Sequence, residues 1–267
     1  MILTVPLYDD SPRRSAPVAT GGLITACAIV FLWQLGEGPR AAHAIALAYG
    51  LVPAVFFGSA ELPPQLQLVP SWATLFTSMF LHGGWLHLLG NMLYLWIFGR
   101  AVENALGPLR FLLFYFLCGA LAGLVQAAID PGAEVPMVGA SGAIAGVLGA
   151  YLLLYPRGNV VVLLWIIIFL RLVTVPAILM LGLWFLLQLV NAASATAGSG
   201  GVAFWAHVGG FIAGMLMVSF FRRRGVGIFQ APRTDSFILA HPRDTRGDWR
   251  RSFLSDGQAP RRRGPWG

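Results

Sequence analysis

One serine stands among glycines in the apolar stretch VGASGAIAGVLG at residues 138–149, and its hydroxyl could act as a nucleophile. Ser141 is followed by Gly142 and preceded, two residues earlier, by Gly139. A serine hydroxyl is a weak nucleophile unless a neighbouring base takes its proton, and histidine is the usual base. Catalysis by Ser141 therefore requires a base, most commonly a histidine, at a matching position in another segment.

His207 is the histidine whose surroundings match those of Ser141. It lies in the stretch WAHVGGFIAG at residues 205–214, near the start of an apolar segment. His207, Gly210 and Gly214 are three and four residues apart, so they share one face of a helix. A Gly-xxx-Gly pair lets a second helix approach closely. Close packing of the two glycine-rich segments would bring the two side chains within hydrogen-bond reach, which predicts a Ser141–His207 dyad.

A third polar stretch, HGGWLHLLGN at residues 82–91, could stabilise negative charge on a carbonyl oxygen under attack. His87 and Asn91 are four residues apart and share one helix face. An imidazole and an amide on one face can donate hydrogen bonds to an oxyanion, and the backbone N–H of Ser141 could add another. His82 precedes His87 by five residues, so it lies either about 140° around the helix or before the helix begins.

Each of these polar residues also has an ordinary structural explanation. A serine in a membrane helix often hydrogen-bonds to a carbonyl one turn back, and glycine stripes mostly serve helix packing. His82, His87 and His207 could instead bind a metal, but no carboxylate or cysteine joins them in a span. The acids Asp130 and Glu134 lie in a loop. The sequence therefore favours a Ser–His dyad without an aspartate, and we expect no metal and no cofactor.

The composition indicates that these residues belong to a membrane protein. Of the 267 residues, 57% are hydrophobic and 11% are charged, which is about half the charged fraction of a typical soluble domain. All 18 basic residues are arginine, and eleven of them follow residue 221, against four acids. This basic end is typical of a cytoplasmic segment beside a membrane. Because no basic stripe with interleaved aromatic residues occurs, we expect no nucleic-acid partner.

Six apolar segments can be assigned as membrane-spanning helices, so we predict an all-α polytopic membrane protein with a six-transmembrane-helix bundle. Prolines break the stretch 36–70, which is not expected to span. The stretch 159–191 is too long for one helix, and we expect residues 160–172 to lie at the membrane interface. The six predicted spans are 18–35, 73–99, 109–128, 138–155, 174–191 and 202–221.

The distribution of arginine predicts the topology. Both ends are rich in arginine, and the loops after the second and fourth spans carry Arg100, Arg110 and Arg157. The loops after the other spans carry only Arg40. The positive-inside rule then makes both termini cytoplasmic, and Ser141 faces outward, in what we expect to be a bacterial plasma membrane. The predicted parts are a cytoplasmic N-terminal segment (1–17), a six-helix domain (18–221) and a basic, disordered cytoplasmic tail (222–267).

Three motifs in combination resemble those of the rhomboid intramembrane serine proteases. They are GASGAIAG at 139–146, AHVGGFIAG at 206–214 and HGGWLHLLGN at 82–91. The resemblance covers about residues 18–221. It implies a six-helix bundle with a water-filled cavity open to the outside, and a serine endopeptidase that cleaves in or near the transmembrane helices of membrane protein substrates. Its partners would be those substrates and the lipid bilayer.

The resemblance also implies a role for each motif residue. Ser141 would be the nucleophile and His207 the base, and the oxyanion hole would consist of His87, Asn91 and the Ser141 N–H. GRAVENALG at 99–107 resembles the segment after the family's second helix, with Glu103 as a structural acid. The supporting residues are His82, Gly139, Gly142, Gly210 and Gly214.

The chain departs from the family pattern at two positions. Ala73 follows Trp72 where the family often has a Trp-Arg pair, and Ala145 stands where some members place a tyrosine against the catalytic histidine. Another residue must therefore hold His207.

Two other functions compete with proteolysis. A rhomboid-like binding protein that cuts nothing would be expected to lack the serine or the histidine. Against a transporter or channel stand the missing internal repeat and the single outward cluster of serine, histidine and asparagine.

Overall fold

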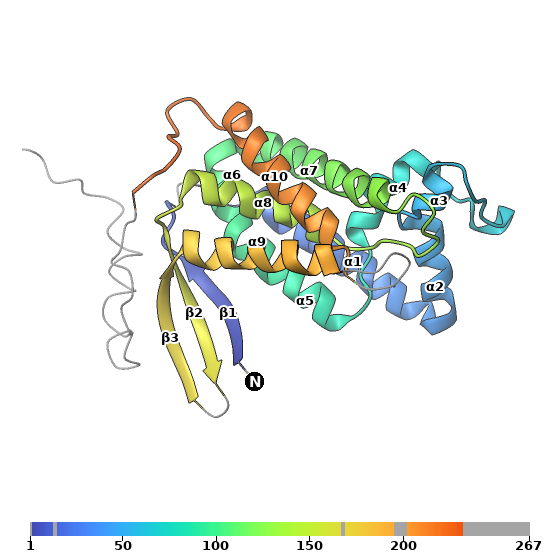
Figure 1. Cartoon of the computed structure of the whole chain (residues 1–267), viewed down its shortest axis with the longest axis horizontal. Helices are drawn as coiled ribbons and strands as arrows, with labels where there is room; N and C mark the ends of the chain where they lie inside the picture. Colours follow the sequence, from blue (N-terminus) through green and yellow to red (C-terminus); the bar gives the residue numbers. More distant parts are fainter. Residues whose placement is uncertain (1, 13–14, 167–168, 195–201, 232–267) are drawn as a thin grey trace, which may run out of the picture.

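The computed structural model describes residues 2–12, 15–166, 169–194 and 202–231. In these residues the chain forms a bundle of helices with a small β-sheet at one end (Figure 1). The longer helices are α1 (Val18–Gly36), α2 (Gly38–Tyr49), α5 (Trp85–Tyr94), α7 (Pro108–Ile129), α8 (Ser141–Leu154), α9 (Ala177–Ser194) and α10 (Phe204–Phe221). The shorter pieces are α3 (Pro53–Phe56), η1 (Pro64–Leu66), η2 (Ser71–Ala73), α4 (Thr74–Thr77), η3 (Ser78–Phe80), the π-helical turn η4 (Leu95–Gly99) and α6 (Arg100–Leu106). The strands are β1 (Ile2–Asp9), β2 (Asn159–Ile166) and β3 (Phe169–Pro176).

Four of the described helices, α1, α7, α9 and α10, are long and apolar enough to cross a membrane. Their ends lie within three residues of four of the predicted spans. The helix α8 is shorter, with 14 residues, and it is buried along most of its length. The chain is therefore a mostly helical, multi-pass membrane protein in which the helix that begins with Ser141 lies at the centre.

The second apolar segment differs from the prediction of one span over 73–99. Residues 74–80 form α4 and η3, the chain is extended at Leu81, and a new helix starts at Trp85. The Gly83–Gly84 pair favours this break, because each glycine in a helix costs about 1 kcal/mol relative to alanine. From Trp85 the helical backbone continues through η4 and α6 to Leu106. That prediction was therefore wrong by about three turns at its start, and it also ended too early.

The expectation of an all-α chain is wrong for two segments. The strands β1, β2 and β3 form an antiparallel sheet in that order. The predicted N-terminal segment therefore contributes β1, and the predicted interfacial piece is the β2–β3 hairpin. Runs of β-branched residues at 160–162 and 173–175 favour strands over helix.

The sheet lies at the end of the bundle where α8 ends and α9 begins (Figure 1). Backbone hydrogen bonds fix the first turn of α9 there. The N–H of Ala177 donates to the carbonyl of Gly158 over 2.7 Å, and the N–H of Ile178 donates to the carbonyl of Pro156 over 3.0 Å. The start of α9 is therefore anchored to the turn that follows α8.

A buried carboxylate from α6 holds the start of α1. Glu103 is 1% exposed, and it accepts hydrogen bonds from the backbone N–H groups of Ala19 (2.9 Å) and Thr20 (2.8 Å). The N–H groups in the first turn of a helix have no partner within that helix, and a negative charge is favourable at this end. These contacts give Glu103 the structural role expected from the sequence.

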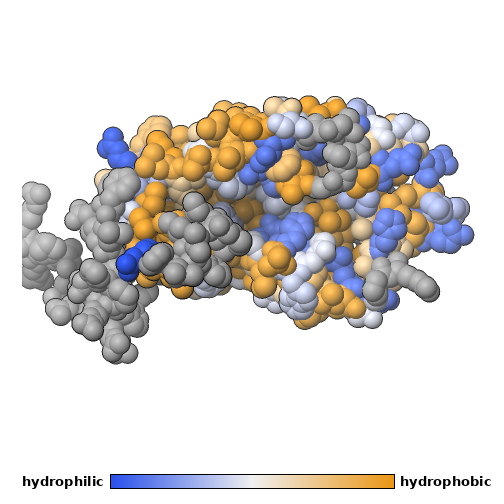
Figure 2. Space-filling model, turned by 60° about the horizontal axis from the view of Figure 1, so that its bottom comes forward, coloured by the Kyte–Doolittle hydropathy of each residue, from blue (hydrophilic) through white to orange (hydrophobic). Residues whose placement is uncertain are grey.

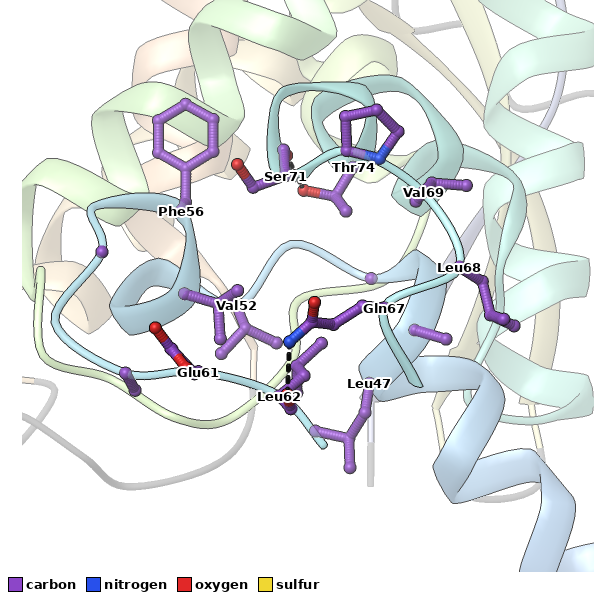
Figure 3. Close-up of a pocket in the computed structure, with 16 residues that line it drawn as sticks. Leu47, Val52, Phe56, Glu61, Leu62, Gln67, Leu68, Val69, Ser71 and Thr74 are labelled. Atoms are coloured by element: carbon purple, nitrogen blue, oxygen red, sulfur yellow. Dashed lines mark hydrogen bonds between the residues drawn. The ribbon is translucent and has the colours of Figure 1, made fainter. Parts of the chain in front are cut away.

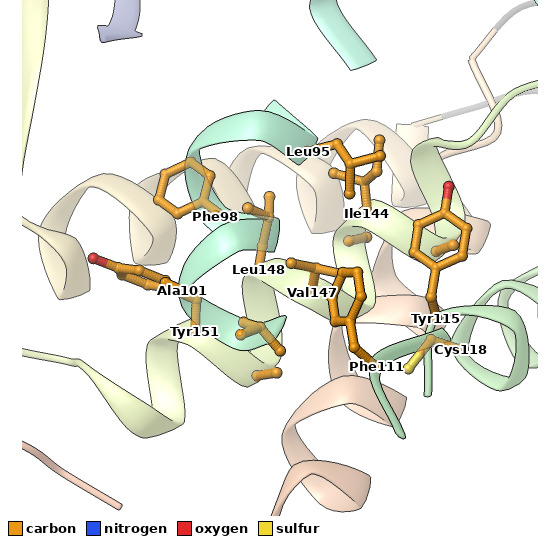
Figure 4. Packing of buried hydrophobic residues seen from close by; sticks show 14 of the residues in the cluster. Leu95, Phe98, Ala101, Phe111, Tyr115, Cys118, Ile144, Val147, Leu148 and Tyr151 are labelled. Carbon is orange, nitrogen blue, oxygen red and sulfur yellow. The ribbon is translucent and has the colours of Figure 1, made fainter. Parts of the chain in front are cut away.

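The hydrophobic core surrounds α8. Figure 4 shows how side chains from α7 and from the continuous helix of η4 and α6 converge on it. The labelled residues include Phe111 and Tyr115 of α7, Phe98 of η4, and Leu148 and Tyr151 of α8, all of them fully buried. This packing fixes the position of α8 within the bundle.

The first residues of the predicted C-terminal tail lie against the bundle. The backbone N–H of Arg223 donates to the carbonyl of Ala105 over 2.9 Å. Farther on, Phe229 and Gln230 donate to the carbonyls of Leu153 and Leu154 over 3.0 and 2.8 Å. Residues 222–231 therefore have a defined place, and the expectation of disorder for 232–267 falls outside the described residues.

Candidate active site

Ser141 and His207 lie beside each other at the N-terminal ends of α8 and α10. The Oγ of Ser141 is 2.8 Å from the Nε2 of His207, although 66 positions separate the two residues. Ser141 is the first residue of α8, and His207 lies in the first turn of α10. The imidazole is 8% exposed. This distance permits proton transfer from the hydroxyl to the imidazole.

Glycines bring α8 and α10 into backbone contact. A Cβ atom added to Gly210 would overlap the carbonyl of Gly142, and one added to Gly214 would overlap the backbone of Gly146. Any larger residue at these positions would push the two helices apart. Because the first of these contacts is next to Ser141, the glycines set the distance between the serine and the histidine.

Two residues of α9 contact His207, and the sequence analysis missed both. The Nδ1 of His207 is 2.8 Å from the Oε1 of Gln188. The ring of Trp184 lies 5.9 Å from the imidazole, centre to centre, at an interplanar angle of 36°. Ala145, where a tyrosine was missing from the family pattern, is fully buried. A signal for Gln188 was present, because a polar side chain inside an apolar span is a functional candidate by default.

His87 and Asn91 of α5 face the backbone just before Ser141. A Cβ atom added to Gly139 would lie 2.7 Å from the Nε2 of His87 and 3.9 Å from the Nδ2 of Asn91. Gly139 also has a φ angle of 125°, a conformation that other residues rarely adopt. Glycine is needed at this position for both reasons. The structure therefore brings the imidazole and the amide together beside the residue two positions before Ser141.

Hydrogen bonds determine which atoms of this pair can donate. The backbone N–H of Gly83 donates to the Nδ1 of His87 over 3.3 Å, so the ring proton is on Nε2. One amide hydrogen of Asn91 is used by the carbonyl of His87 at 2.9 Å, which leaves the second one. The backbone N–H of Ser141 belongs to the first turn of α8, where such groups have no partner within the helix. Three donors of this kind suit a developing oxyanion.

His82 lies against His87 and is 3% exposed. Its ring stands edge-on to that of His87, with 5.2 Å between the ring centres. Its backbone N–H donates to the Oε1 of Gln34 over 3.1 Å, and its Nδ1 lies 3.2 Å from the carbonyl of Phe80. These contacts support the position of His87. Within the described ranges no three His, Cys, Asp or Glu side chains are grouped so that they could hold a metal ion.

A cavity of about 640 Å³ lies apart from these residues, in the segment between α1 and α5 (Figure 3). Its walls include Phe56, Glu61 and Thr74, and the amide of Gln67 donates to the carbonyl of Leu62 over 2.6 Å. None of the predicted site residues lines it. This cavity therefore does not belong to the serine–histidine site.

The surface of the bundle is largely hydrophobic. Exposed large apolar side chains occur on all four long helices, for example Leu113 on α7, Leu187 on α9 and Leu216 on α10. Figure 2 shows a face dominated by such residues, with hydrophilic residues in its hollowed middle. A surface of this kind is suited to contact with lipid.

Comparison with known proteins matches the larger part of the chain to one family. The family model described as "Rhomboid domain" matches residues 69–224. Rhomboid protease GluP of Bacillus subtilis is 42% identical over 98 residues, or 37% of this chain. Rhomboid-like protein 11, chloroplastic, of Arabidopsis thaliana is 30% identical over 159 residues, or 56% of the chain. Rhomboid protein 1, mitochondrial, of Saccharomyces cerevisiae is 33% identical over 159 residues, or 57% of the chain.

The chain matches only part of the length of each of these relatives. The matched regions cover 18% of the Bacillus protein, 52% of the Arabidopsis protein and 42% of the yeast protein. The matched residues 69–224 include Ser141, His207, His87 and Asn91.

Proposed function

The chain belongs to the rhomboid family, and we propose that it is a serine endopeptidase that hydrolyses peptide bonds in or near the transmembrane helices of membrane protein substrates. The observation that carries this proposal is the 2.8 Å contact between the Ser141 hydroxyl and the His207 imidazole. The contact lies inside a multi-pass bundle with an apolar surface, and a donor cluster lies next to it.

The first half of the reaction forms an acyl enzyme. The Nε2 of His207 takes the proton from the Ser141 hydroxyl as the oxygen attacks the carbonyl carbon of the substrate. The negative oxygen of the tetrahedral intermediate accepts hydrogen bonds from the three donors at His87, Asn91 and the Ser141 N–H. The C–N bond then breaks as His207 returns the proton to the leaving amine, and the substrate's acyl group stays on the serine as an ester.

The second half of the reaction requires water. His207 takes a proton from a water molecule, whose oxygen attacks the ester carbonyl through the same oxyanion site. The ester bond breaks, the serine oxygen regains its proton from His207, and the product leaves as a carboxylic acid that loses its proton to water. No step in this scheme requires a metal or a cofactor.

We assign six transmembrane segments to this protein. They are the four long helices, the continuous helix from Trp85 to Leu106, and α8. A helix of 14 residues, the length of α8, spans about 21 Å, which is less than the roughly 30 Å of the hydrocarbon core. With the C-terminal end of α8 at one interface, Ser141 lies about 10 Å below the other interface. A shallow water-filled opening is enough to supply the hydrolytic water at that depth.

The arrangement in the membrane follows from the arginine pattern. We propose that both termini are cytoplasmic, that Ser141 faces outward, and that the chain resides in a bacterial plasma membrane. In this arrangement the protease domain is 18–221, flanked by the segments 1–17 and 222–267. The substrates are membrane proteins with small or helix-breaking residues near the outward end of a span, because such residues let a helix unwind to expose a carbonyl.

Cleavage in reconstituted vesicles tests this function. The substrate is a single-span reporter with small and helix-breaking residues at one end of its span. We expect the wild-type chain to cut it, and we expect Ser141→Ala and His207→Ala to leave it intact. Equal cleavage by the wild-type chain and Ser141→Ala, or no cleavage by the wild-type chain, contradicts the proposal.

A further inference from the structure

We infer that Gln188 is a positioning residue that holds His207 in the tautomer and orientation needed for the Ser141 proton transfer. The inference rests on the proposed function and adds a third member to the site, on α9. It starts from the contact of 2.8 Å between the Oε1 of Gln188 and the Nδ1 of His207.

The chemistry of the two atoms fixes the tautomer. A side-chain amide oxygen can only accept a hydrogen bond, so the Nδ1 of His207 must carry the ring proton. The Nε2 of the neutral ring then presents its lone pair to the Ser141 hydroxyl 2.8 Å away. This is the form in which the imidazole can act as a base. The opposite tautomer would place a lone pair against the amide oxygen and a proton against the serine.

Gln188 lies on the face of α9 that contacts His207, as the positioning role requires. Gln188 stands four residues after Trp184, so both side chains lie on the same face of α9. Trp184 lies beside the imidazole ring, 5.9 Å away centre to centre, while Gln188 contacts the edge nitrogen that does not face the serine. Two of the three residues between them, Leu186 and Leu187, are exposed apolar side chains. The amide is thus a polar group in an apolar helix, and its oxygen is directed at His207.

The alternative is that Gln188 serves only to dock α9 on α10. Other contacts already do this. The rings of Phe185 and Phe211 are stacked at 4.5 Å with an angle of 22°, and the start of α9 is anchored by the backbone bonds of Ala177 and Ile178. Loss of one amide contact should therefore leave α9 in place. The inference predicts a defect in the rate of Ser141 chemistry and no defect in folding.

The test measures the inactivation of the full-length protein in detergent by an alkyl fluorophosphonate, with kinact and KI determined separately. Gln188→Leu has a similar size and no acceptor, whereas Gln188→Glu keeps the acceptor. Leu187→Ala, on the lipid-facing side of the same turn, is the matched control. We expect Gln188→Leu to lower kinact by about 10- to 100-fold, the range for losing one or two oriented hydrogen bonds, with KI and the melting temperature unchanged. Gln188→Glu should restore kinact to within a few-fold of wild type, and Leu187→Ala should match wild type.

The outcomes separate this inference from the proposed function. If the wild-type chain reacts and Gln188→Leu reacts at the same rate, the positioning role is wrong while the protease assignment stands. The positioning role is also wrong if Gln188→Leu and Gln188→Glu lose activity equally, or if both lower the melting temperature. If the wild-type chain itself does not react at Ser141, the proposed function fails, and this inference fails with it.

Discussion

Gly210→Ala tests whether the backbone contact between α8 and α10 sets the distance between Ser141 and His207. Gly210 lies one turn after His207, and its neighbour across the interface is Gly142, next to Ser141. The added methyl group would overlap the Gly142 carbonyl oxygen, with the carbonyl carbon 3.1 Å away and the Cβ of Ala122 in α7 3.3 Å away. The methyl group therefore meets atoms of both α7 and α8, and α10 has to move away from α8.

The size of the effect follows from these distances. Carbon atoms pack favourably at about 3.5–4.0 Å, so we expect the helices to separate by about 1 Å at this point. The Ser141–His207 distance would grow from 2.8 Å to a value beyond the roughly 3.2 Å upper end of a good hydrogen bond. A misplacement of about 1 Å costs roughly 100-fold in rate, and the overpacking costs about 1–3 kcal/mol of stability.

The assay is the rate of fluorophosphonate labelling at Ser141, measured together with the thermal melting of the same sample. Gly182→Ala is the matched control, because a Cβ atom at that glycine of α9 would meet nothing within 4 Å apart from its chain neighbours and the backbone of its own helix. An alanine in an open position of a helix is neutral or stabilises by about 0.5–1 kcal/mol. We expect Gly182→Ala to label like wild type and Gly210→Ala to label about 100-fold more slowly.

The opposite result is a Gly210→Ala protein that labels at the rate of wild type and melts at the same temperature. That result would mean that the close approach of α8 and α10 does not set the distance between the two side chains. A lower melting temperature with an unchanged labelling rate would also contradict the link between this contact and the site.

Three other changes have defined outcomes. Glu103→Ala leaves the N–H groups of Ala19 and Thr20 without their acceptor, so the free energy of unfolding measured by denaturation should fall by about 1–3 kcal/mol. The stability of Glu103→Gln should lie between those of wild type and Glu103→Ala, and equal stability of all three proteins would contradict the capping role. His87→Ala removes one proposed oxyanion donor and should lower the rate of peptide cleavage by about 100- to 1,000-fold, with no change expected in the melting temperature; cleavage at the wild-type rate would exclude His87 from the oxyanion hole. Gly139→Ala introduces a Cβ atom 2.7 Å from the Nε2 of His87, in a backbone conformation with φ 125°. Both the fluorophosphonate labelling rate and the stability should therefore fall, and wild-type values for both would show that this turn tolerates a side chain.

Much of the site could be anticipated from residue spacing. The glycines beside Ser141 and His207 predict a close approach of two helices, because small residues at helical spacing are visible in each local sequence. The family resemblance and the multi-pass helical character are confirmed. The roles of Ser141, His207, His87 and Asn91 remain predictions. Gln188 was visible as a polar residue in an apolar run, but its contact with His207 depends on how α9 is rotated about its axis, which the run does not specify.

Other parts of the fold depend on contacts that no local pattern encodes. The pairing of β1 with β2 joins the start of the chain to residues far along the sequence, such as Val5 and Leu163. A strand in an apolar hairpin is as hydrophobic as a buried helix segment, so hydrophobicity alone could not separate them, although the β-branched runs at 160–162 and 173–175 favour strands. The second span was misplaced for a related reason. Its apolar character continues on both sides of the Gly83–Gly84 pair, so hydrophobicity alone does not place the start of the helix at Trp85.

The catalytic dyad is tested most directly by identifying the residue that a fluorophosphonate modifies in the purified full-length protein. We expect a single adduct on the peptide that contains Ser141, absent from Ser141→Ala and strongly reduced in His207→Ala. The same dependence should appear in the cleavage of a membrane-embedded substrate. An adduct on another residue, or equal labelling of wild type and Ser141→Ala, would contradict the claim that Ser141 and His207 form a catalytic dyad.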